Sequence, residues 1–303
     1  MLFRSLVAVS ALLVATPVLA QDSGAQDPGT AVQTAAAAFV QPSNAERLRV
    51  ITEQLTAAGL PYEVQTFAGG NDRTGPMEGK NVVITLGEGA KDIVLTAHYD
   101  AVKLRDGSLA QGIVDNAGSV LAMIEAAKAL QGQQTDHRVI FVLTDQEELG
   151  LIGAKHWLEG HDKARIHAVV NADVAAYGQT VMYGLNNGDH SGFVLSALRL
   201  QCAEQGVECM PYPVYPPSDD RVFSAAGVPV VSLGTQDAIG AHQMWLAFNG
   251  GEDNGLREGF VPPVFQRIHS TEDRLELLNG ADVARFGRFV ADLALRLDKT
   301  AAE

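Results

Sequence analysis

The sequence lacks basic clusters, and after its first 20 residues it also lacks any long apolar run. A helix that spans a membrane needs about 20 predominantly apolar residues, so we expect no membrane span in the mature chain. Only 22 lysines and arginines stand against 36 aspartates and glutamates, and the formal net charge is −14. This charge opposes binding to nucleic acid and to anionic membranes, so we expect no nucleic acid as a partner, and it fits a soluble exported protein.

The one apolar stretch that resembles a span lies at the amino terminus. Residues 1–20 contain one arginine, an apolar centre from Leu6 to Val14, and small residues up to Ala20. This pattern is typical of a cleavable signal peptide cut after Ala20, and it predicts a periplasmic or secreted protein. Gln21 follows the cut, so no cysteine is there to carry a lipid.

Cysteine is nearly absent, because Cys202 and Cys209 are the only two in the chain. Their spacing matches neither a zinc ribbon nor a redox motif. Exported proteins meet oxidising conditions, which favours a disulfide that closes the short loop between the two residues. Two free buried thiols are the alternative.

We expect one α/β domain over residues 41–303, preceded by a loose lead-in over residues 21–40, which has no strong periodicity. Gly69-Gly70 is expected to form a turn. The predicted helices cover residues 43–58, 120–130, 149–158, 190–205 and 282–297, with Ser43 and Asp282 as N-caps. The predicted strands cover residues 62–67, 80–86, 92–97, 139–144, 166–170 and 227–233. These elements predict a three-layer α/β/α sandwich with a mixed, mostly parallel central sheet.

Two adjacent carboxylates, Glu147 and Glu148, follow the apolar strand predicted at residues 139–144. In open α/β sheets the ligand crevice lies at the carboxyl ends of the strands, where paired acids can hold a metal or move a proton. The alternative is that both residues only stabilise the positive N-terminus of the next helix.

Other acids and a histidine follow other predicted strands. Residues two apart on an extended segment face the same side, so Asp100 can hold one ring nitrogen of His98 and leave the other free for a metal. An ordinary hydrogen-bonded pair is the alternative. Asp115 precedes the helix at residues 120–130, where capping is its alternative role. Asp173 follows the strand at residues 166–170.

Six short segments carry these residues, and they occur over residues 98–273. They are His98-Tyr99-Asp100, Val114-Asp115-Asn116-Ala117, Thr144–Gly150, Asn171-Ala172-Asp173, Ser218-Asp219 and Ile268–Asp273. Together and in this order, the segments resemble the M28 metallopeptidases, the co-catalytic zinc aminopeptidases. The resemblance implies the zinc-peptidase form of the α/β/α sandwich, which is also called phosphorylase/hydrolase-like.

The resemblance also implies a site for two zinc ions. The implied ligands are His98 and Asp173 for one ion, Glu148 and His269 for the other, and Asp115 as the bridge between them. Imidazole and carboxylate groups are the ligands that zinc prefers, and only a carboxylate has two oxygens to share between two ions. Co²⁺ or Mn²⁺ can occupy similar ligands. Glu147 would be the general base, which takes a proton from the attacking water and gives it to the leaving amine.

The segment after residue 210 departs from the family pattern. Asp220 stands where the family usually has a histidine after Ser218-Asp219, which puts the role of that histidine in doubt. Tyr215 occupies a position where some members carry a tyrosine that supports the oxyanion, and a packing role in a proline-rich loop is the alternative. His242 is the chief rival of His269 as a metal ligand.

The stretch from residue 234 to residue 264 is expected to be irregular and longer than a simple connection. Its position before His269 favours a loop beside the active site, and a cover over a sheet edge is the alternative.

The sequence therefore predicts an exported zinc aminopeptidase that acts on peptides with a free N-terminus. A glutaminyl-peptide cyclotransferase with a single zinc ion on a related fold is the nearest alternative. A binding module without activity on the same fold is a further one. The ligand set argues against both, because neither a ligand nor the base is missing.

Overall fold

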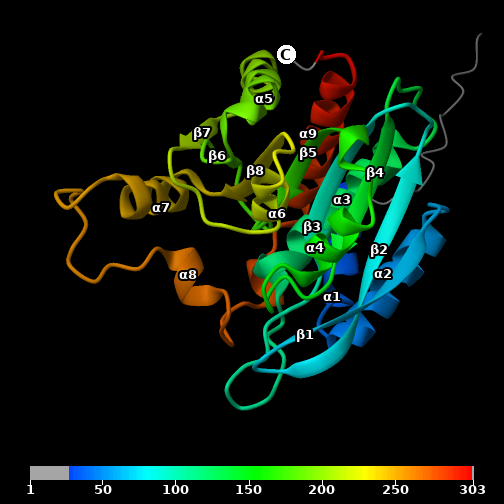
Figure 1. Ribbon diagram of the computed structural model, residues 1–303. Helices are drawn as coiled ribbons and strands as arrows, with labels where there is room; N and C mark the ends of the chain where they lie inside the picture. The colour runs from blue at the N-terminus through cyan, green and yellow to red at the C-terminus, as the bar shows by residue number, and fades with distance from the viewer. Residues whose placement is uncertain (1–26, 302–303) are drawn as a thin grey trace, which may run out of the picture.

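A mixed sheet runs through the centre of the protein, whose computed structural model describes residues 27–301 (Figure 1). The predicted signal peptide, residues 1–20, lies outside the described residues. Within them the sheet has eight strands, in the order β1-β2-β4-β3-β5-β8-β6-β7. The strands are β1 (Glu63–Asn71), β2 (Gly75–Leu86), β3 (Asp92–His98), β4 (Arg138–Thr144), β5 (Ile166–Ala172), β6 (Thr180–Gly184), β7 (Cys209–Tyr212) and β8 (Val230–Gln236).

The four central strands β4, β3, β5 and β8 are parallel to one another. The hairpin of β1 and β2 extends the sheet through an antiparallel pairing of β2 with β4. At the other side β6 is antiparallel to β8, and β7 is parallel to β6. The expected mixed, mostly parallel sheet is confirmed.

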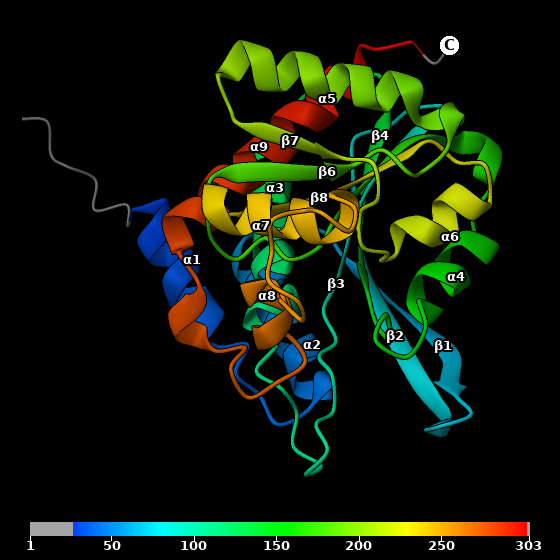
Figure 2. The ribbon, with the colours of Figure 1, turned by 90° about the vertical axis from the view of Figure 1, so that its left-hand side faces the viewer.

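Helices cover both faces of this sheet (Figure 2). They are α1 (Pro28–Ala37), α2 (Asn44–Ala57), α3 (Gly118–Leu130), α4 (Ile152–Glu159), α5 (Gly192–Gln205), α6 (Asp220–Ala225), α7 (Ala238–Asn249), α8 (Pro263–Arg267) and α9 (Gly280–Asp298). One apolar core joins Leu95 and Phe141 of the sheet to helices that include α1, α2, α3, α5 and α9. A second core joins Val94 of the opposite face to Trp157 of α4 and Phe223 of α6. The three-layer α/β/α architecture is confirmed.

The central strands bring their carboxyl ends to one edge of the sheet. All seven residues of β3 are buried, as are six of the seven in β4, because helices cover both faces. The chain emerges from this covered region directly after Thr144 of β4 and Ala172 of β5, while His98 is the last residue of β3. Polar residues that follow three neighbouring parallel strands are therefore held close together.

Asp92 begins β3 at the opposite edge, where its side chain is fully buried. It accepts hydrogen bonds from Arg138 Nε at 2.8 Å and His161 Nε2 at 2.8 Å, and a longer one from Arg165 Nε at 3.4 Å. Burial raises the pKa of Asp92, but these three donors outweigh burial and hold the pKa below its ordinary value of 3.8. The ion pairs therefore stabilise the folded state through the charged form of Asp92.

The prediction of a loose lead-in as far as residue 40 is wrong for the described part of that segment. Asp27 caps α1 by accepting from the Thr30 amide, and Val32 and Phe39 are buried in the main core. Helix α1 packs against α9, where Gly29 lies so near Ala281 that a Cβ would come within 2.9 Å of its Cα. Helix α1 has little periodicity in the sequence because, besides Gly29, only Val32 and Ala36 of the helix are buried, and tertiary packing on α9 stabilises it.

The prediction of an irregular stretch over residues 234–264 is also wrong for most of its length. Strand β8 continues to Gln236, and Asp237 then caps α7 by accepting from the Gly240 amide. Only residues 250–262 between α7 and α8 lack regular structure. Helix α7 contains a glycine and is followed by Gly250-Gly251, and only three of its residues, Gly240, Ala241 and Met244, are buried, so its sequence shows little helical periodicity.

Smaller details differ as well. Gly69-Gly70 lies inside β1 rather than in a turn, and Asn279 rather than Asp282 caps α9. Strands β6 and β7 were not predicted. A disulfide joins Cys202 of α5 to Cys209 of β7, so that expectation is confirmed. Among residues 27–301 no helix combines the length and the apolar character that a membrane span requires.

Candidate metal centre

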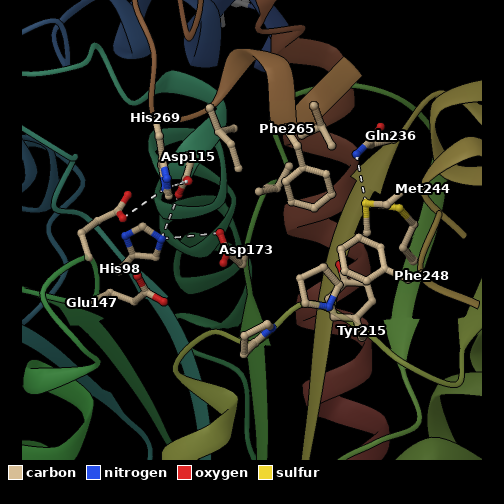
Figure 3. Close-up of a pocket in the computed structure, with 17 residues that line it drawn as sticks. His98, Asp115, Glu147, Asp173, Tyr215, Gln236, Met244, Phe248, Phe265 and His269 are labelled. Atoms are coloured by element: carbon tan, nitrogen blue, oxygen red, sulfur yellow. Dashed lines mark hydrogen bonds and ion pairs between the residues drawn. The ribbon is translucent and has the colours of Figure 1, made fainter. Parts of the chain in front are cut away.

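Two groups of acids and histidines face each other at the carboxyl edge of the sheet (Figure 3). The first consists of His98, Glu147 and Asp173, and the second of Asp115, Glu148 and His269. Within each group the possible ligand atoms lie within 4.8 Å of one another. The structure therefore brings together all five residues that the sequence predicts as metal ligands. The predicted base, Glu147, lies in the first group beside them.

Asp115 lies between the two imidazole rings. Its Oδ1 is 3.1 Å from His98 Nε2, and its Oδ2 is 3.1 Å from His269 Nε2. Asp173 Oδ1 lies 3.5 Å from His98 Nε2, and Glu148 Oε2 lies 3.1 Å from His269 Nε2. Each oxygen of Asp115 thus faces a different histidine, and each histidine has a second carboxylate beside the same nitrogen.

The donor set fits a divalent metal. Glu148 Oε1 is buried and has no hydrogen-bond partner among the described residues, and Asp115 Oδ1 and Asp173 Oδ1, although near His98 Nε2, form no well-aligned hydrogen bond. An unpaired buried carboxylate oxygen is costly unless a cation or a donor satisfies it. Because imidazole nitrogen and carboxylate oxygen are ligands that zinc accepts, a metal would satisfy these atoms.

The electrostatics of the site favour positive charge. Hydrogen bonds to Asp115 and Glu148 raise the pKa of His269 to about 10. Burial raises the pKa of Asp115, but His269 and His98 outweigh burial and hold it well below its ordinary value. Burial raises the pKa of Glu147 to about 9, against the opposing effect of His98. The carboxylates thus hold protons on the histidines when no other cation is present.

Asp100 positions the segment that carries both glutamates. Its Oδ1 accepts from the backbone N–H of Glu147 at 3.1 Å, and its Oδ2 accepts from that of Glu148 at 3.2 Å. The Nδ1 atom of His98 lies 3.2 Å from the backbone oxygen of Asp100 and 3.5 Å from its Oδ1. Asp100 therefore contacts the Nδ1 side of the His98 ring and leaves Nε2 directed at Asp115 and Asp173. We call the two groups of acids and histidines the metal groups.

Asp273 has a comparable role that we did not predict. Its Oδ1 accepts from the backbone N–H groups of Ile113 at 2.9 Å and Val114 at 2.7 Å, and its Oδ2 accepts from that of Asp115 at 3.1 Å. Asp115 lies in a kinked segment with a non-helical backbone rather than at an N-cap. The signal was present in the sequence, because Asp273 belongs to the same matching segment as His269.

Arg47 of α2 was also missed. Its fully buried guanidinium donates to the backbone oxygens of Tyr99 at 2.7 Å, Gln111 at 2.6 Å and Gly112 at 3.0 Å. Burial lowers the pKa of Arg47 to about 10, and the nearby carboxylates, first among them Asp100, oppose that effect. An arginine on the apolar face of a predicted helix was the available signal.

Asp220, which stands in place of the family's usual histidine, does not face the metal groups. It is buried, and its Oδ1 accepts from the backbone N–H of Ser218 at 2.9 Å within its own loop. The neighbouring Asp219 accepts from Thr144 Oγ1 at 2.5 Å, which ties this loop to the end of β4. His242 is exposed on α7 and belongs to neither metal group.

A cavity of about 370 Å³ extends from the metal groups toward the end of β8. Apart from the two groups, its walls are uncharged. They consist of Val174, Met182, Tyr215, Pro216, Pro217, Gln236, Met244, Phe248, Val264, Phe265 and Ile268. Tyr215 is buried between β6 and β8, and burial together with Asp173 raises the pKa of its hydroxyl well above 10. It is a neutral hydrogen-bond donor at any physiological pH.

The sheet and the two facing groups define an α/β protein with a metal centre of imidazole and carboxylate side chains at the carboxyl ends of its strands. The chain belongs to peptidase family M28, because the model of that family matches residues 81–294. Aminopeptidase YwaD of Bacillus subtilis is 27% identical over 144 residues, which is 45% of this chain and 30% of YwaD. The match thus spans less than a third of that relative.

Solved structures share the fold. The LapA aminopeptidase of Legionella pneumophila has a TM-score of 0.63 and 17% identity, with 91% of this chain and 72% of LapA covered. A glutaminyl cyclase from an Acidobacteriales bacterium has a TM-score of 0.65 and 21% identity, with 94% and 98% covered. At these identities the likeness establishes the architecture, and the match to the family model establishes membership of peptidase family M28.

Proposed function

We propose that the protein is an exported aminopeptidase that uses two zinc ions. The observation that carries this proposal is the position of Asp115, whose two oxygens each lie 3.1 Å from a different histidine. A carboxylate in this position can serve two ions at once, which a site for one ion does not require.

In this proposal His98 and Asp173 hold one ion, Glu148 and His269 hold the other, and Asp115 is shared. Zinc would supply Lewis acidity and would lower the pKa of water in the site. Glu147 remains outside the ligand set, although it is grouped in space with His98 and Asp173. Beside two zinc dications the pKa of Glu147 would fall from about 9, so that its carboxylate is available to accept the proton of the attacking water and to deliver it to the leaving amine.

Tyr215 supports the same reaction from the cavity wall. Its hydroxyl lies in the same cavity as Glu147 and Asp173 and is held in the neutral, donating form. We assign this hydroxyl to donate to the oxygen of the scissile carbonyl, where negative charge develops.

The shape of the cavity favours removal of one residue from a free N-terminus. A cavity of about 370 Å³ next to the metal groups has room for one side chain but not for an extended peptide. The carboxylates beside it attract the α-ammonium group. Its uncharged walls favour a first residue without a charged side chain.

Export is supported by two observations. Residues 1–20 carry the signal-peptide pattern, and the disulfide between Cys202 and Cys209 is a bond that persists in oxidising compartments.

A glutaminyl cyclase is the second candidate, because solved glutaminyl cyclases share the fold over nearly the whole chain. The two activities give different products from a peptide with N-terminal glutamine. The aminopeptidase releases free glutamine, whereas the cyclase releases ammonia and leaves pyroglutamate on the peptide. Product analysis of this single substrate, with and without a chelator, separates the candidates.

The general-base assignment is tested with Glu147→Gln. We expect this variant to retain both zinc ions and to lose about 10²–10⁴-fold in kcat, because proton transfer contributes that much. Glu159→Gln, an exposed position on α4, is the matched control and should behave as wild type. Unchanged turnover would refute the base, and loss of one zinc ion would make Glu147 a ligand instead.

A further inference from the structure

Apart from Tyr215 and the two groups of acids and histidines, Gln236 is the only polar side chain among the described residues that line the cavity. It is the last residue of β8, is 1% exposed, and lies across the cavity from His98 and Asp115 (Figure 3). We propose that Gln236 is a specificity residue whose amide hydrogen-bonds a neutral polar atom at the tip of the substrate's first side chain. This inference rests on the proposed aminopeptidase function, and it predicts a preference for N-terminal tyrosine over phenylalanine.

The position of Gln236 along β8 suits this role. Asp173 N donates to Leu233 O at 2.9 Å, so the metal-site end of β5 lies beside Leu233 and Gly234 of β8. A Cβ at Gly234 would lie 2.5 Å from the backbone oxygen of Asp173 and 2.6 Å from the Tyr215 hydroxyl. Gln236 is two residues further and faces the same side, about 7 Å along the strand. The distance from the metal groups to the Gln236 amide therefore roughly matches the length of a long side chain of the substrate.

The amide has a weak partner in the free protein. Its Nε2 donates to Met244 Sδ at 3.7 Å, and this is the one hydrogen bond of the Gln236 side chain within residues 27–301. Thioether sulfur is a weak acceptor, so a buried N–H group that points at it gains from a stronger acceptor. A phenolic oxygen is such an acceptor, and a phenyl ring offers none.

The walls of the cavity also disfavour a first substrate residue whose side chain ends in a charged group. Beyond the metal groups no charged side chain lines the cavity. A lysine, arginine, aspartate or glutamate tip would lose its hydration there and receive only one neutral amide in return. The pocket therefore accepts an apolar stem with an uncharged tip.

The test compares kcat/KM for tyrosine and phenylalanine 7-amido-4-methylcoumarin substrates, which differ by one hydroxyl. We expect wild type to prefer tyrosine about tenfold, the value of one additional hydrogen bond. Gln236→Leu should bring the ratio close to one, and Met244→Leu should raise it above wild type by removing the internal acceptor. Gln243→Leu, on α7 but outside the cavity walls, is the matched control and should keep the wild-type ratio.

A gain of function provides the second arm. Gln236→Glu places a carboxylate at the same point, so kcat/KM for lysine and arginine substrates should rise at least tenfold relative to phenylalanine. A ratio of tyrosine to phenylalanine that stays at the wild-type value in folded, zinc-loaded Gln236→Leu would overturn the inference. If that variant does not fold, an unchanged selectivity in Gln236→Glu overturns it. Wild type that cleaves none of these substrates but releases glutamine from the peptide with N-terminal glutamine overturns the inference alone, whereas wild type that releases no amino acid from any of them refutes the proposed function.

Discussion

Replacement of Asp273 by asparagine should weaken metal binding although Asp273 is not a ligand. Its carboxylate accepts from three consecutive backbone N–H groups, at 2.9 Å, 2.7 Å and 3.1 Å, and the third belongs to Asp115. Asparagine has the same shape but only one acceptor oxygen. Its NH₂ group would then face at least one of these backbone donors, and that buried N–H would lose its partner.

The magnitude follows from the lost hydrogen bond. A hydrogen bond to a charged group contributes about 1.5–3 kcal/mol, so the segment from Ile113 to Asp115 loses roughly 2 kcal/mol of the interaction that holds it in place. Since 1.4 kcal/mol corresponds to a factor of ten, the affinity for zinc should fall about 30-fold. This agrees with the range of about 10–100-fold known for residues that orient metal ligands. Both ions should be affected, because Asp115 is shared between the two groups.

The assay is a competition between metal-free protein and a chromogenic chelator, followed by titration with zinc. Glu272→Gln is the matched control, since Glu272 is the exposed neighbour and its partner, Arg274, is also exposed. An Asp273→Asn variant that keeps a native circular dichroism spectrum and binds zinc as tightly as wild type would refute the reasoning.

Three further predictions concern other parts of the molecule. Asp115→Ala should hold fewer than two zinc ions per chain by elemental analysis, and a full complement would contradict the shared ligand. Tyr215→Phe should lower kcat about 10²-fold with little change in KM, as expected for one lost donor to the scissile carbonyl oxygen; an unchanged kcat leaves the tyrosine as a packing residue. Asp92→Asn should destabilise the protein by roughly 3 kcal/mol at pH 7 in urea unfolding, because it breaks the ion pairs with Arg138 and Arg165 and weakens the hydrogen bonding with His161. The folded pKa of Asp92 lies below 3.8, so its contribution is present above that pH and is lost below it. The difference between Asp92→Asn and wild type should therefore shrink as the pH falls below 3.8, and a constant difference would show that charge is not the cause.

The sequence predicted best those strands that are buried on both faces of the sheet. The central strands are continuous apolar runs, so β3, β4 and β5 and the polar residues after them could be placed without a structure. Strands at the edge of the sheet lack such a continuous apolar run. Strand β7, with the sequence Cys-Met-Pro-Tyr, is short and partly exposed, and only its pairing with β6 makes it a strand.

Residues that act on the backbone were the hardest to predict. His98 and Glu148 belong to residue types that bind metals, and their positions at strand ends make them visible. Asp273 and Arg47 instead bind backbone atoms of segments more than 50 residues away in the chain. Their side chains could equally have been placed at the surface, because only the tertiary fold reveals which carbonyl and amide groups they meet.

The buried guanidinium of Arg47 gives the site a permanent countercharge. It is hydrogen-bonded to the loops that carry Asp100 and Asp115, and it remains protonated at neutral pH because its pKa stays near 10. The carboxylates of the site repel one another, and the positive charge of Arg47 opposes this repulsion together with the protonated histidines. Folding of the chain thus places a positive charge beside these carboxylates and lowers the electrostatic cost of holding them close together. The loop that carries Asp115 is therefore anchored by a cation that belongs to the chain itself.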